Sequence, residues 1–129
     1  MATTIRAKPF KGQFFSRLEM RCRCWSPSCT APAMDADFME RLGALRHDWG
    51  RPLIVNSAAR CAAHNAKVGG SPKSQHLLGL AADLRVNTPN DGVALAALAE
   101  KHGFKGIGVA KTFVHLDLRA GPAVRWEYP

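Results

Sequence analysis

The chain has 129 residues, of which 47% are hydrophobic and 22% charged; this composition is typical of one globular domain and excludes a wholly disordered chain. Residues 93–99 form its longest purely apolar run, far short of the roughly 20 residues that cross a bilayer, and residues 1–15 lack the apolar core of a signal peptide. We therefore expect a single monomeric domain over residues 1–129, with 1–15 as a loosely ordered arm, made in the cytoplasm and not inserted into a membrane.

The formal net charge of +8 favours an acidic partner or surface, because a positive field attracts anions. Nucleic acid, anionic lipid and anionic cell-wall polymer all meet that description, and a merely solubilising surface explains the charge equally well. The basic residues are scattered without a block of five or six, which argues against a dedicated nucleic-acid-binding tail.

The N-terminal half is expected to hold a short helix, a loop and a longer helix. Ser16 and Glu19 have the spacing of a capping box, which predicts that a helix begins there. The prolines in residues 22–32 exclude a long regular element, because proline removes a backbone donor and restricts the residue before it. Residues 35–49 place apolar side chains every three or four positions, which predicts a helix that ends at Gly50.

The remaining sequence alternates short strands with helices. Apolar and β-branched runs predict a buried strand at 53–55 and further strands at 80–86, 107–109 and 113–118. Two helices are predicted at 60–67 and 91–102, each followed by glycine. This order predicts an α+β domain with a small, mainly antiparallel sheet and helices packed on one of its faces.

Polar side chains share one face of the predicted strands. In the last strand His115, Asp117 and Arg119 alternate with apolar residues, so the three point to the same side. If strand 80–86 is its neighbour, Asp83 lies beside His115, and His76 comes from the loop just before it. Two histidines and a carboxylate are the ligand types of a catalytic zinc site, which keeps a fourth position open.

The sequence around His76 carries a more specific pattern. The pattern Ser-x-His-x-x-Gly-x-Ala-x-Asp is matched at Ser74, His76, Gly79, Ala81 and Asp83. With the later strand around His115, it resembles the LAS-type zinc peptidases of the M15 group, which include D-alanyl-D-alanine carboxypeptidases and phage endolysins and have the hedgehog signalling domain as a distant relative. The resemblance covers about residues 14–126, and segments 106–108, 113–117 and 125–126 are similar to a compact subgroup. It implies a hedgehog-like fold with Zn²⁺ held on the open sheet face by His76, Asp83 and His115.

The resemblance also implies substrate-binding residues. The segment 54–65 is similar to the family's strand and turn that end in an arginine and an asparagine. In relatives that arginine binds the substrate carboxylate or steadies the transition state, and Arg60 matches it here. Asn65 and Ser74 are further candidates for substrate binding, and the hydroxyl of Ser74 is expected to fix its loop rather than to act as a nucleophile.

The general base departs from the family pattern. Several carboxypeptidase relatives have Glu or Asp three residues before the last ligand histidine, where this chain has Thr112, which has no acid–base function near neutral pH. Asp117 lies two residues beyond His115, about 6.6 Å along the strand, and is the first candidate, with Glu127 as the second. The alternative role for Asp117 is to orient a ligand histidine.

These expectations combine into a zinc-dependent peptidase that hydrolyses an amide bond of peptidoglycan stem peptides, as an endolysin-like DD-carboxypeptidase or endopeptidase. Zinc polarises the carbonyl, Asp117 takes the proton of the attacking water, and Arg60 holds a carboxylate or the developing oxyanion. Such a protein acts on the cell wall, in the periplasm, and is encoded by a phage or a cell. Two alternatives stay open: a non-catalytic, hedgehog-like zinc module, favoured by Thr112, and a basic nucleic-acid-binding protein built around the cysteines.

The state of the cysteines is open at this point. Cys22, Cys24 and Cys29 are clustered in the loop, and Cys61 stands apart. The cluster could be half of a structural zinc site, could form disulfides with Cys61 after export, or could consist of reduced thiols. The sequence does not favour a second zinc ion at the three loop cysteines.

Overall fold

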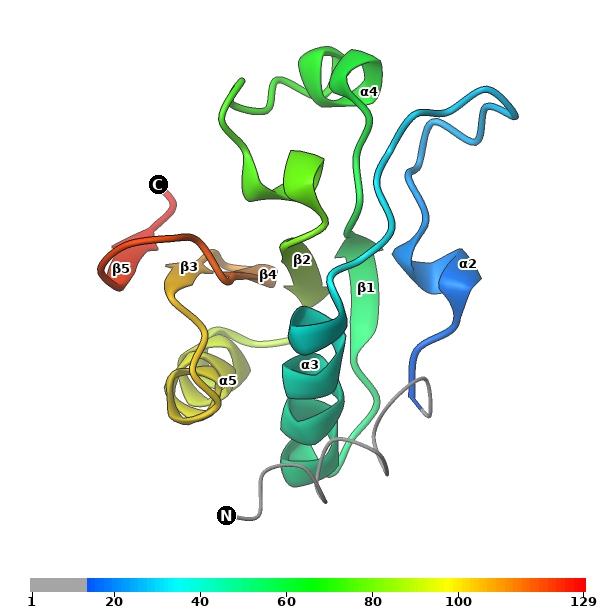
Figure 1. Cartoon of the computed structure of the whole chain (residues 1–129). Helices are drawn as coiled ribbons and strands as arrows, with labels where there is room; N and C mark the ends of the chain where they lie inside the picture. Colours follow the sequence, from blue (N-terminus) through cyan, green and yellow to red (C-terminus); the bar gives the residue numbers. More distant parts are fainter. Residues whose placement is uncertain (1–13) are drawn as a thin grey trace.

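Five strands form one mixed sheet in the computed structural model, which describes residues 14–129 of the chain (Figure 1). The strands are β1 (Ile54–Ser57), β2 (Ala81–Arg85), β3 (Gly106–Val109), β4 (Phe113–Asp117) and β5 (Val124–Glu127). The helices are α2 (Arg17–Met20), α3 (Ala36–Trp49), α4 (Ala62–Lys67) and α5 (Pro89–Lys101), with one 3-10 turn, η1 (Gln75–Leu78). The arm predicted at residues 1–15 lies outside the described residues, apart from Phe14 and Phe15.

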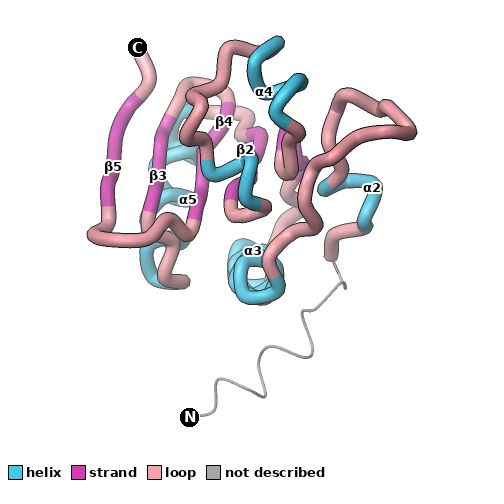
Figure 2. Tube along the Cα trace, turned by 45° about the horizontal axis from the view of Figure 1, so that its top comes forward, coloured by secondary structure: helices cyan, strands magenta, loops and turns pink. Residues whose placement is uncertain are grey.

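The strands follow the order β1-β2-β4-β3-β5 across the sheet (Figure 2). Neighbouring strands are antiparallel except for β3 and β5, which run parallel, so the predicted α+β fold with a mainly antiparallel sheet is confirmed. In the β2–β4 pair Asp83 lies opposite His115, and Ala81 lies opposite Asp117. Because side chains alternate between the faces of a sheet, this register brings Asp83, His115 and Asp117 to the same face.

Helices α3 and α5 pack on the other face of the sheet and supply much of the core (Figure 1). The largest fully buried apolar side chains of this core are Phe38, Leu42, Leu45, Leu84, Leu95, Val114 and Leu116. Phe38 also meets the ring of Phe104 edge to face, with 5.5 Å between the ring centroids. This packing supports β2 and β4 from behind, so that their polar face stands on a rigid base.

The predicted capping box at Ser16 and the predicted stop at Gly50 are confirmed, whereas α4 begins at Ala62 instead of residue 60 and α5 at Pro89 instead of residue 91. The Ser16 hydroxyl accepts a hydrogen bond from the Glu19 N–H (3.1 Å), and the Glu19 carboxylate accepts one from the Ser16 N–H (2.8 Å), which together form the capping box of α2. Asp35 caps α3, and Gly50 ends it in the left-handed region, with φ at 73°. No helix among residues 14–129 is both long and apolar enough to cross a membrane.

Two parts of the sheet differ from the prediction. The strand expected at 53–55 is present as β1, but it lies at the edge of the sheet and continues to Ser57, and Ile54 is 48% exposed whereas Leu53 and Val55 are buried. The sequence also does not predict β5 or η1, which are four residues each. Strand β5 pairs only with β3, so its formation depends on a distant partner rather than on a strong local signal.

Candidate active site

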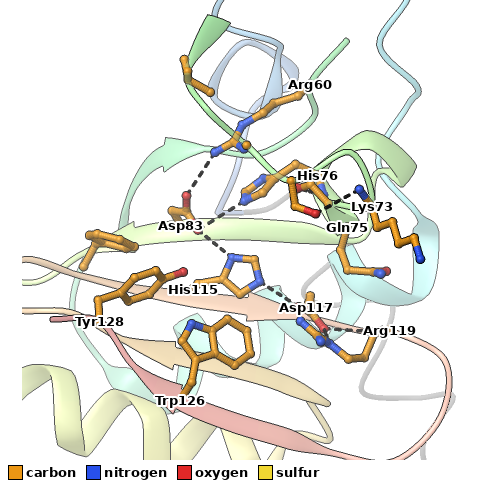
Figure 3. Close-up of a pocket in the computed structure, with 15 residues that line it drawn as sticks. Arg60, Lys73, Gln75, His76, Asp83, His115, Asp117, Arg119, Trp126 and Tyr128 are labelled. Carbon is orange, nitrogen blue, oxygen red and sulfur yellow. Dashed lines mark hydrogen bonds and ion pairs between the residues drawn. The ribbon is translucent and has the colours of Figure 1, made fainter. Parts of the chain in front are cut away.

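A pocket of about 600 Å³ opens on the polar face of the sheet (Figure 3). Strands β2, β4 and β5, turn η1 and the segment on either side of α4 supply its wall. The titratable side chains in this wall are Arg60, Lys73, His76, Asp83, His115, Asp117, Arg119 and Tyr128. The pocket therefore combines residues that are far apart in the sequence on the face that α3 and α5 leave open.

His76, Asp83 and His115 converge in this pocket as the sequence pattern predicts. Asp83 Oδ1 lies 3.3 Å from His76 Nε2 and 2.9 Å from His115 Nδ1. One ligand atom from each of the three residues lies within 4.8 Å of the other two, so together they could hold a metal ion. The register of β2 and β4 sets Asp83 opposite His115, and η1 brings His76 to them from above the strands (Figure 3).

The hydrogen bonds behind the two histidines determine which nitrogen faces the centre. His76 Nδ1 lies 2.7 Å from the carbonyl oxygen of Ala58, which can only accept, so Nδ1 carries a proton, and Nε2, which faces Asp83, is the nitrogen that could bind a metal. His115 Nε2 lies 2.7 Å from Asp117 Oδ2 and donates to this carboxylate, which leaves Nδ1 facing Asp83. Metal-binding histidines are usually oriented by such a bond from the other ring nitrogen, so this donor set fits zinc.

Asp117 is fully buried, and its lone pairs are already used. Its Oδ2 accepts from His115 Nε2 (2.7 Å) and Arg119 Nη2 (2.7 Å). Its Oδ1 accepts from the Arg119 backbone N–H (3.1 Å) and from Nε (2.9 Å). A carboxylate offers about four lone-pair sites, and these four bonds fill them. The geometry therefore favours the orienting role of Asp117 over the base role.

Arg60 reaches the centre from the opposite side and is held by three neighbours. Its Nε donates to Ser57 Oγ (3.1 Å), its Nη1 donates to Asn65 Oδ1 (3.1 Å), and its Nη2 lies 3.5 Å from Asp83 Oδ2. Asn65 also donates to the Ser71 carbonyl (2.8 Å) and is buried behind Arg60 rather than in the pocket wall. Asn65 thus touches Arg60, not the pocket.

Two small structural details complete this support. A Cβ at Gly70 would overlap the side-chain oxygen of Asn65, so only glycine allows the loop to approach that closely. Ser74 lies in the pocket wall, and its hydroxyl accepts a hydrogen bond from the His76 N–H (3.2 Å) as the cap of η1. Ser74 thus fixes the turn that carries His76.

Sequence comparison gives the family. Residues 13–117 match the profile of the family described as Peptidase M15. The chain belongs to this family. Zinc D-Ala-D-Ala carboxypeptidase of Streptomyces albus G is 35% identical over 106 residues, which are 79% of this chain and 41% of the relative. The predicted membership in the M15 group is confirmed, and the chain spans about two fifths of the length of that relative.

Hydrogen bonds set the ionisation of the M15 site. Burial raises the pKa of Asp83, but hydrogen bonds from His115 and His76 outweigh it and hold that pKa well below its usual range. Burial lowers the pKa of His115, whereas its bonds to Asp117 and Asp83 raise it, and the net result is a raised pKa. Burial likewise raises the pKa of Asp117, but His115 and Arg119 hold it below its usual range. Asp83 and Asp117 therefore stay ionised beside His76 and His115, and their negative charge would favour the binding of a cation in this pocket.

The sequence did not identify two aromatic residues of the M15 site. Trp126 lies beside His115, with 5.3 Å between the ring centroids, and the Arg119 guanidinium lies 5.1 Å from the Trp126 centroid. Tyr128 directs its hydroxyl toward Asp83 and His115 (Figure 3). A Cβ at Gly108 would overlap the indole of Trp126, so this glycine makes room for it. The two rings form the β5 side of the pocket.

A weak signal for these rings exists in the sequence. Val124, Trp126 and Tyr128 alternate with polar residues or proline, which is the period of a strand with one covered face. The same alternation directs Glu127 to the other side, where it is exposed and outside the pocket wall. The structure thus brings Arg60, Ser74, His76, Asp83, His115 and Asp117 around one pocket and leaves Glu127 outside it.

Proposed function

We propose that this M15 domain is a zinc-dependent peptidase that hydrolyses amide bonds in peptidoglycan stem peptides, as a DD-carboxypeptidase or an endolysin-like endopeptidase. The observation that carries the proposal is the convergence of His76 Nε2, Asp83 and His115 Nδ1 in one pocket. Zinc bound there would act as a Lewis acid that polarises the scissile carbonyl and acidifies a water molecule. The activity in the name of the Streptomyces albus G relative supports the substrate class.

Arg60 is proposed to bind the anionic part of the substrate. Three of its nitrogen atoms are oriented by Ser57, Asn65 and Asp83. Because a guanidinium has five N–H donors in a fixed plane, two donors remain for a substrate carboxylate or a developing oxyanion. Its side chain is only 13% exposed, so this contact would form in a partly dehydrated site, where charge–charge attraction is stronger.

Asp117 is proposed to act through His115 rather than on the substrate. Its carboxylate accepts a hydrogen bond from His115 Nε2 and keeps Nδ1 directed at Asp83. Arg119 balances the buried charge of Asp117 with two side-chain bonds and one backbone bond. Asp117 is therefore a positioning residue in this proposal.

The proposed substrate locates the action of the domain at the cell wall. Stem peptides and the polymers attached to peptidoglycan are anionic, and a net charge of +8 would attract the domain to them. This attraction would accelerate the encounter of the domain with peptidoglycan, but it would take no part in the hydrolysis itself. It predicts that activity on intact cell walls decreases with salt more steeply than activity on a small soluble muropeptide.

The deciding experiment is mass spectrometry of purified muropeptides after digestion. We expect a product that appears with the zinc-loaded wild type, disappears with a chelator and returns when zinc is added. The mass of that product identifies the bond. His115→Ala should be inactive, whereas His102→Ala should be active, because His102 pairs with Asp48 on the surface, outside the pocket. Product formation that persists in excess chelator would overturn the zinc mechanism.

One observation favours a second candidate, a zinc-binding module without catalytic activity. In the described part of the pocket wall the carboxylates are Asp83 and Asp117, and each already has hydrogen-bonded partners. A module of this kind would bind zinc at the same three residues and be stabilised by it. It would leave every muropeptide intact under the conditions above, which separates it from the peptidase.

A further inference from the structure

Four cysteines converge outside the pocket, on the side of the molecule where the loop after α2 meets the start of α4. Cys22, Cys24 and Cys29 belong to this loop, and Cys61 is the N-cap of α4. Cys22 and Cys61 are buried, with 1% and 7% of their surface exposed, and the other two are half-buried. All four are free cysteines. The fold therefore adds Cys61 to the three cysteines that are close in sequence.

The spacing of the sulfur atoms matches a tetrahedral thiolate site. Four sulfurs at about 2.3 Å from a zinc ion lie about 3.8 Å apart in a regular tetrahedron. Cys22 Sγ and Cys61 Sγ are 3.8 Å apart, and all four sulfurs lie within 4.8 Å of one another. The four thiols thus lie in one group, close enough together to share a single metal ion.

Each of the four sulfurs also accepts a backbone hydrogen bond. The donors, all at 3.4 Å, are Ser26 N to Cys24, Ala31 N to Cys29, His64 N to Cys61 and Cys61 N to Cys22. Hydrogen bonds to the charged form of a group favour that form, and a thiolate is the form that binds metal. The backbone therefore offers each of the four sulfurs a hydrogen bond that favours its thiolate form.

Two arginines and a strained backbone residue next to the cysteines also support a metal site. Arg21 and Arg23 flank Cys22, and both guanidinium groups lie against the ring of Trp25, at 5.4 and 5.6 Å from its centroid. Two cations beside the cluster offset the net negative charge of a zinc–tetrathiolate centre. Trp25 has a positive φ of 55°, which is rare for a bulky residue, and this strained turn directly follows Cys24.

We propose that Cys22, Cys24, Cys29 and Cys61 bind a structural zinc ion, separate from the metal centre of the pocket. Four Zn–S bonds would form, and the thiol protons would pass to solvent. Because four protein ligands leave no position for water or substrate, this zinc would stabilise the fold and perform no hydrolysis. It would anchor a loop that has no regular secondary structure to the start of α4.

The proposed zinc would also stabilise the backbone that carries Arg60. Cys61 follows Arg60 directly, and the Arg60 N–H donates to the His76 carbonyl (3.0 Å). On the other side, the Ala59 N–H donates to the Met20 carbonyl (3.2 Å). The cysteine cluster thus adjoins a segment that connects the end of α2 to the pocket, and its zinc would limit the movement of Arg60.

The first test measures zinc content per chain in full-length protein purified under reducing conditions. Wild type is expected to hold two zinc ions and the double variant His76→Ala/His115→Ala one. Cys24→Ser/Cys29→Ser should also hold one, whereas the matched control Ser28→Ala, an exposed residue of the same loop, should retain two. A double histidine variant that is folded and holds no zinc would overturn the proposal.

The second test uses cobalt as a spectroscopic probe and does not require the cysteine variants to fold. Co²⁺ loaded into His76→Ala/His115→Ala should give the intense thiolate-to-metal charge-transfer absorption of a tetrathiolate site, since the remaining ligands are sulfur. Absence of this absorption, or Cys–Cys linked peptides in protein kept under reducing conditions, would refute the site. Neither readout measures hydrolysis, so the outcome is independent of the proposed peptidase activity.

Discussion

The two groups of this chain that could hold a metal ion are constructed in different ways. In the pocket, Asp83 and His115 are register partners in a sheet, and a hydrogen bond behind each histidine fixes its ring. In the cysteine cluster, most ligands lie in a loop, and backbone N–H groups hold the sulfurs. Three ligands leave a position open for chemistry, whereas four close it. The comparison therefore predicts that substitution of a pocket ligand affects mainly catalysis, whereas substitution of a cysteine of the cluster affects mainly stability.

The largest expected effect is on catalysis, from removing a ligand of the pocket. His76→Ala should lower hydrolysis of a muropeptide by about a thousand-fold or more, because Lewis-acid catalysis contributes several kcal/mol to barrier reduction. The cysteine cluster lies outside this change, so the variant should keep its other zinc ion and a cooperative thermal transition. Hydrolysis rates and circular-dichroism melting curves measured on the same preparations check both statements. Near-wild-type hydrolysis would show that His76 is not a ligand.

The next effect is on stability, from removing a ligand of the cysteine cluster. Cys24→Ser should lower the melting temperature by about 10 °C or more, equivalent to roughly 3 kcal/mol, because a structural zinc contributes directly to folding. Its hydrolysis rate below the transition should decrease far less than that of His76→Ala. Differential scanning calorimetry with Ser28→Ala as the control measures the shift. An unchanged melting temperature would mean that the cysteine cluster does not stabilise the fold, and the contrast with the pocket ligands would fail.

Arg60 connects the two regions and should affect substrate binding most. In Arg60→Lys the ammonium cannot reproduce the bonds to Ser57 and Asn65 at once, because it lacks the planar donor fork. We expect KM for a muropeptide with a free carboxylate to rise about 10-fold to 100-fold, with a smaller change in kcat. Steady-state kinetics with a carboxylate-amidated substrate provide the control, since the wild type should lose a similar factor there. Equal KM values for variant and wild type would exclude this contact.

The candidate metal ligands could be named from the sequence because strand alternation, a short motif and the resemblance to the M15 group all point to them. The alternation of residues in two strands gives the shared face of Asp83, His115 and Asp117, and the motif around His76 supplies the third ligand. The helix caps at Ser16 and Gly50 are local features. The caps depend on residues a few positions apart, whereas the meeting of Asp83 with His115 also requires the pairing of two strands, which the sequence analysis assumes and the structure shows as β2 and β4.

The missed features all depend on contacts between distant segments. Trp126 and Tyr128 enter the pocket only because β5 pairs in parallel with β3, and the meeting of Cys61 with the loop cysteines, which the sequence leaves open, spans an interval of 39 positions. The role of Asp117 is a similar case. The sequence gives its distance from His115 along the strand, but not that Arg119 folds back to occupy its lone pairs.

Asp117→Asn sharpens the difference between an orienting residue and a base. An asparagine keeps the shape but loses the charge that raises the pKa of His115 and pairs with Arg119. Zinc affinity should fall by about 10-fold to 100-fold, as for other partners behind a ligand histidine.

The orienting role of Asp117 also predicts how zinc affinity changes with pH. Zinc competes with the proton on His115, so affinity decreases as pH falls through the raised pKa of that residue. Removing the Asp117 charge lowers this pKa, and the decrease in zinc affinity should therefore begin at lower pH in the variant. Calorimetric titration of zinc across pH measures both effects. A base role would instead give unchanged zinc affinity with a large loss of kcat.

The smallest effect is expected for Glu127, the other carboxylate considered as a base. Glu127 follows Trp126 on β5, but the alternation of the strand turns it away from the pocket to an exposed position. Glu127→Gln should therefore change kcat and zinc affinity by less than about two-fold, since surface substitutions away from a site cost little. The Asp117→Asn and Glu127→Gln variants remove the same charge ten positions apart, one behind a ligand histidine and one outside the pocket. A large loss of kcat in Glu127→Gln alone would mean that β5 turns over when substrate binds, and the pocket described here would then not be the catalytic arrangement.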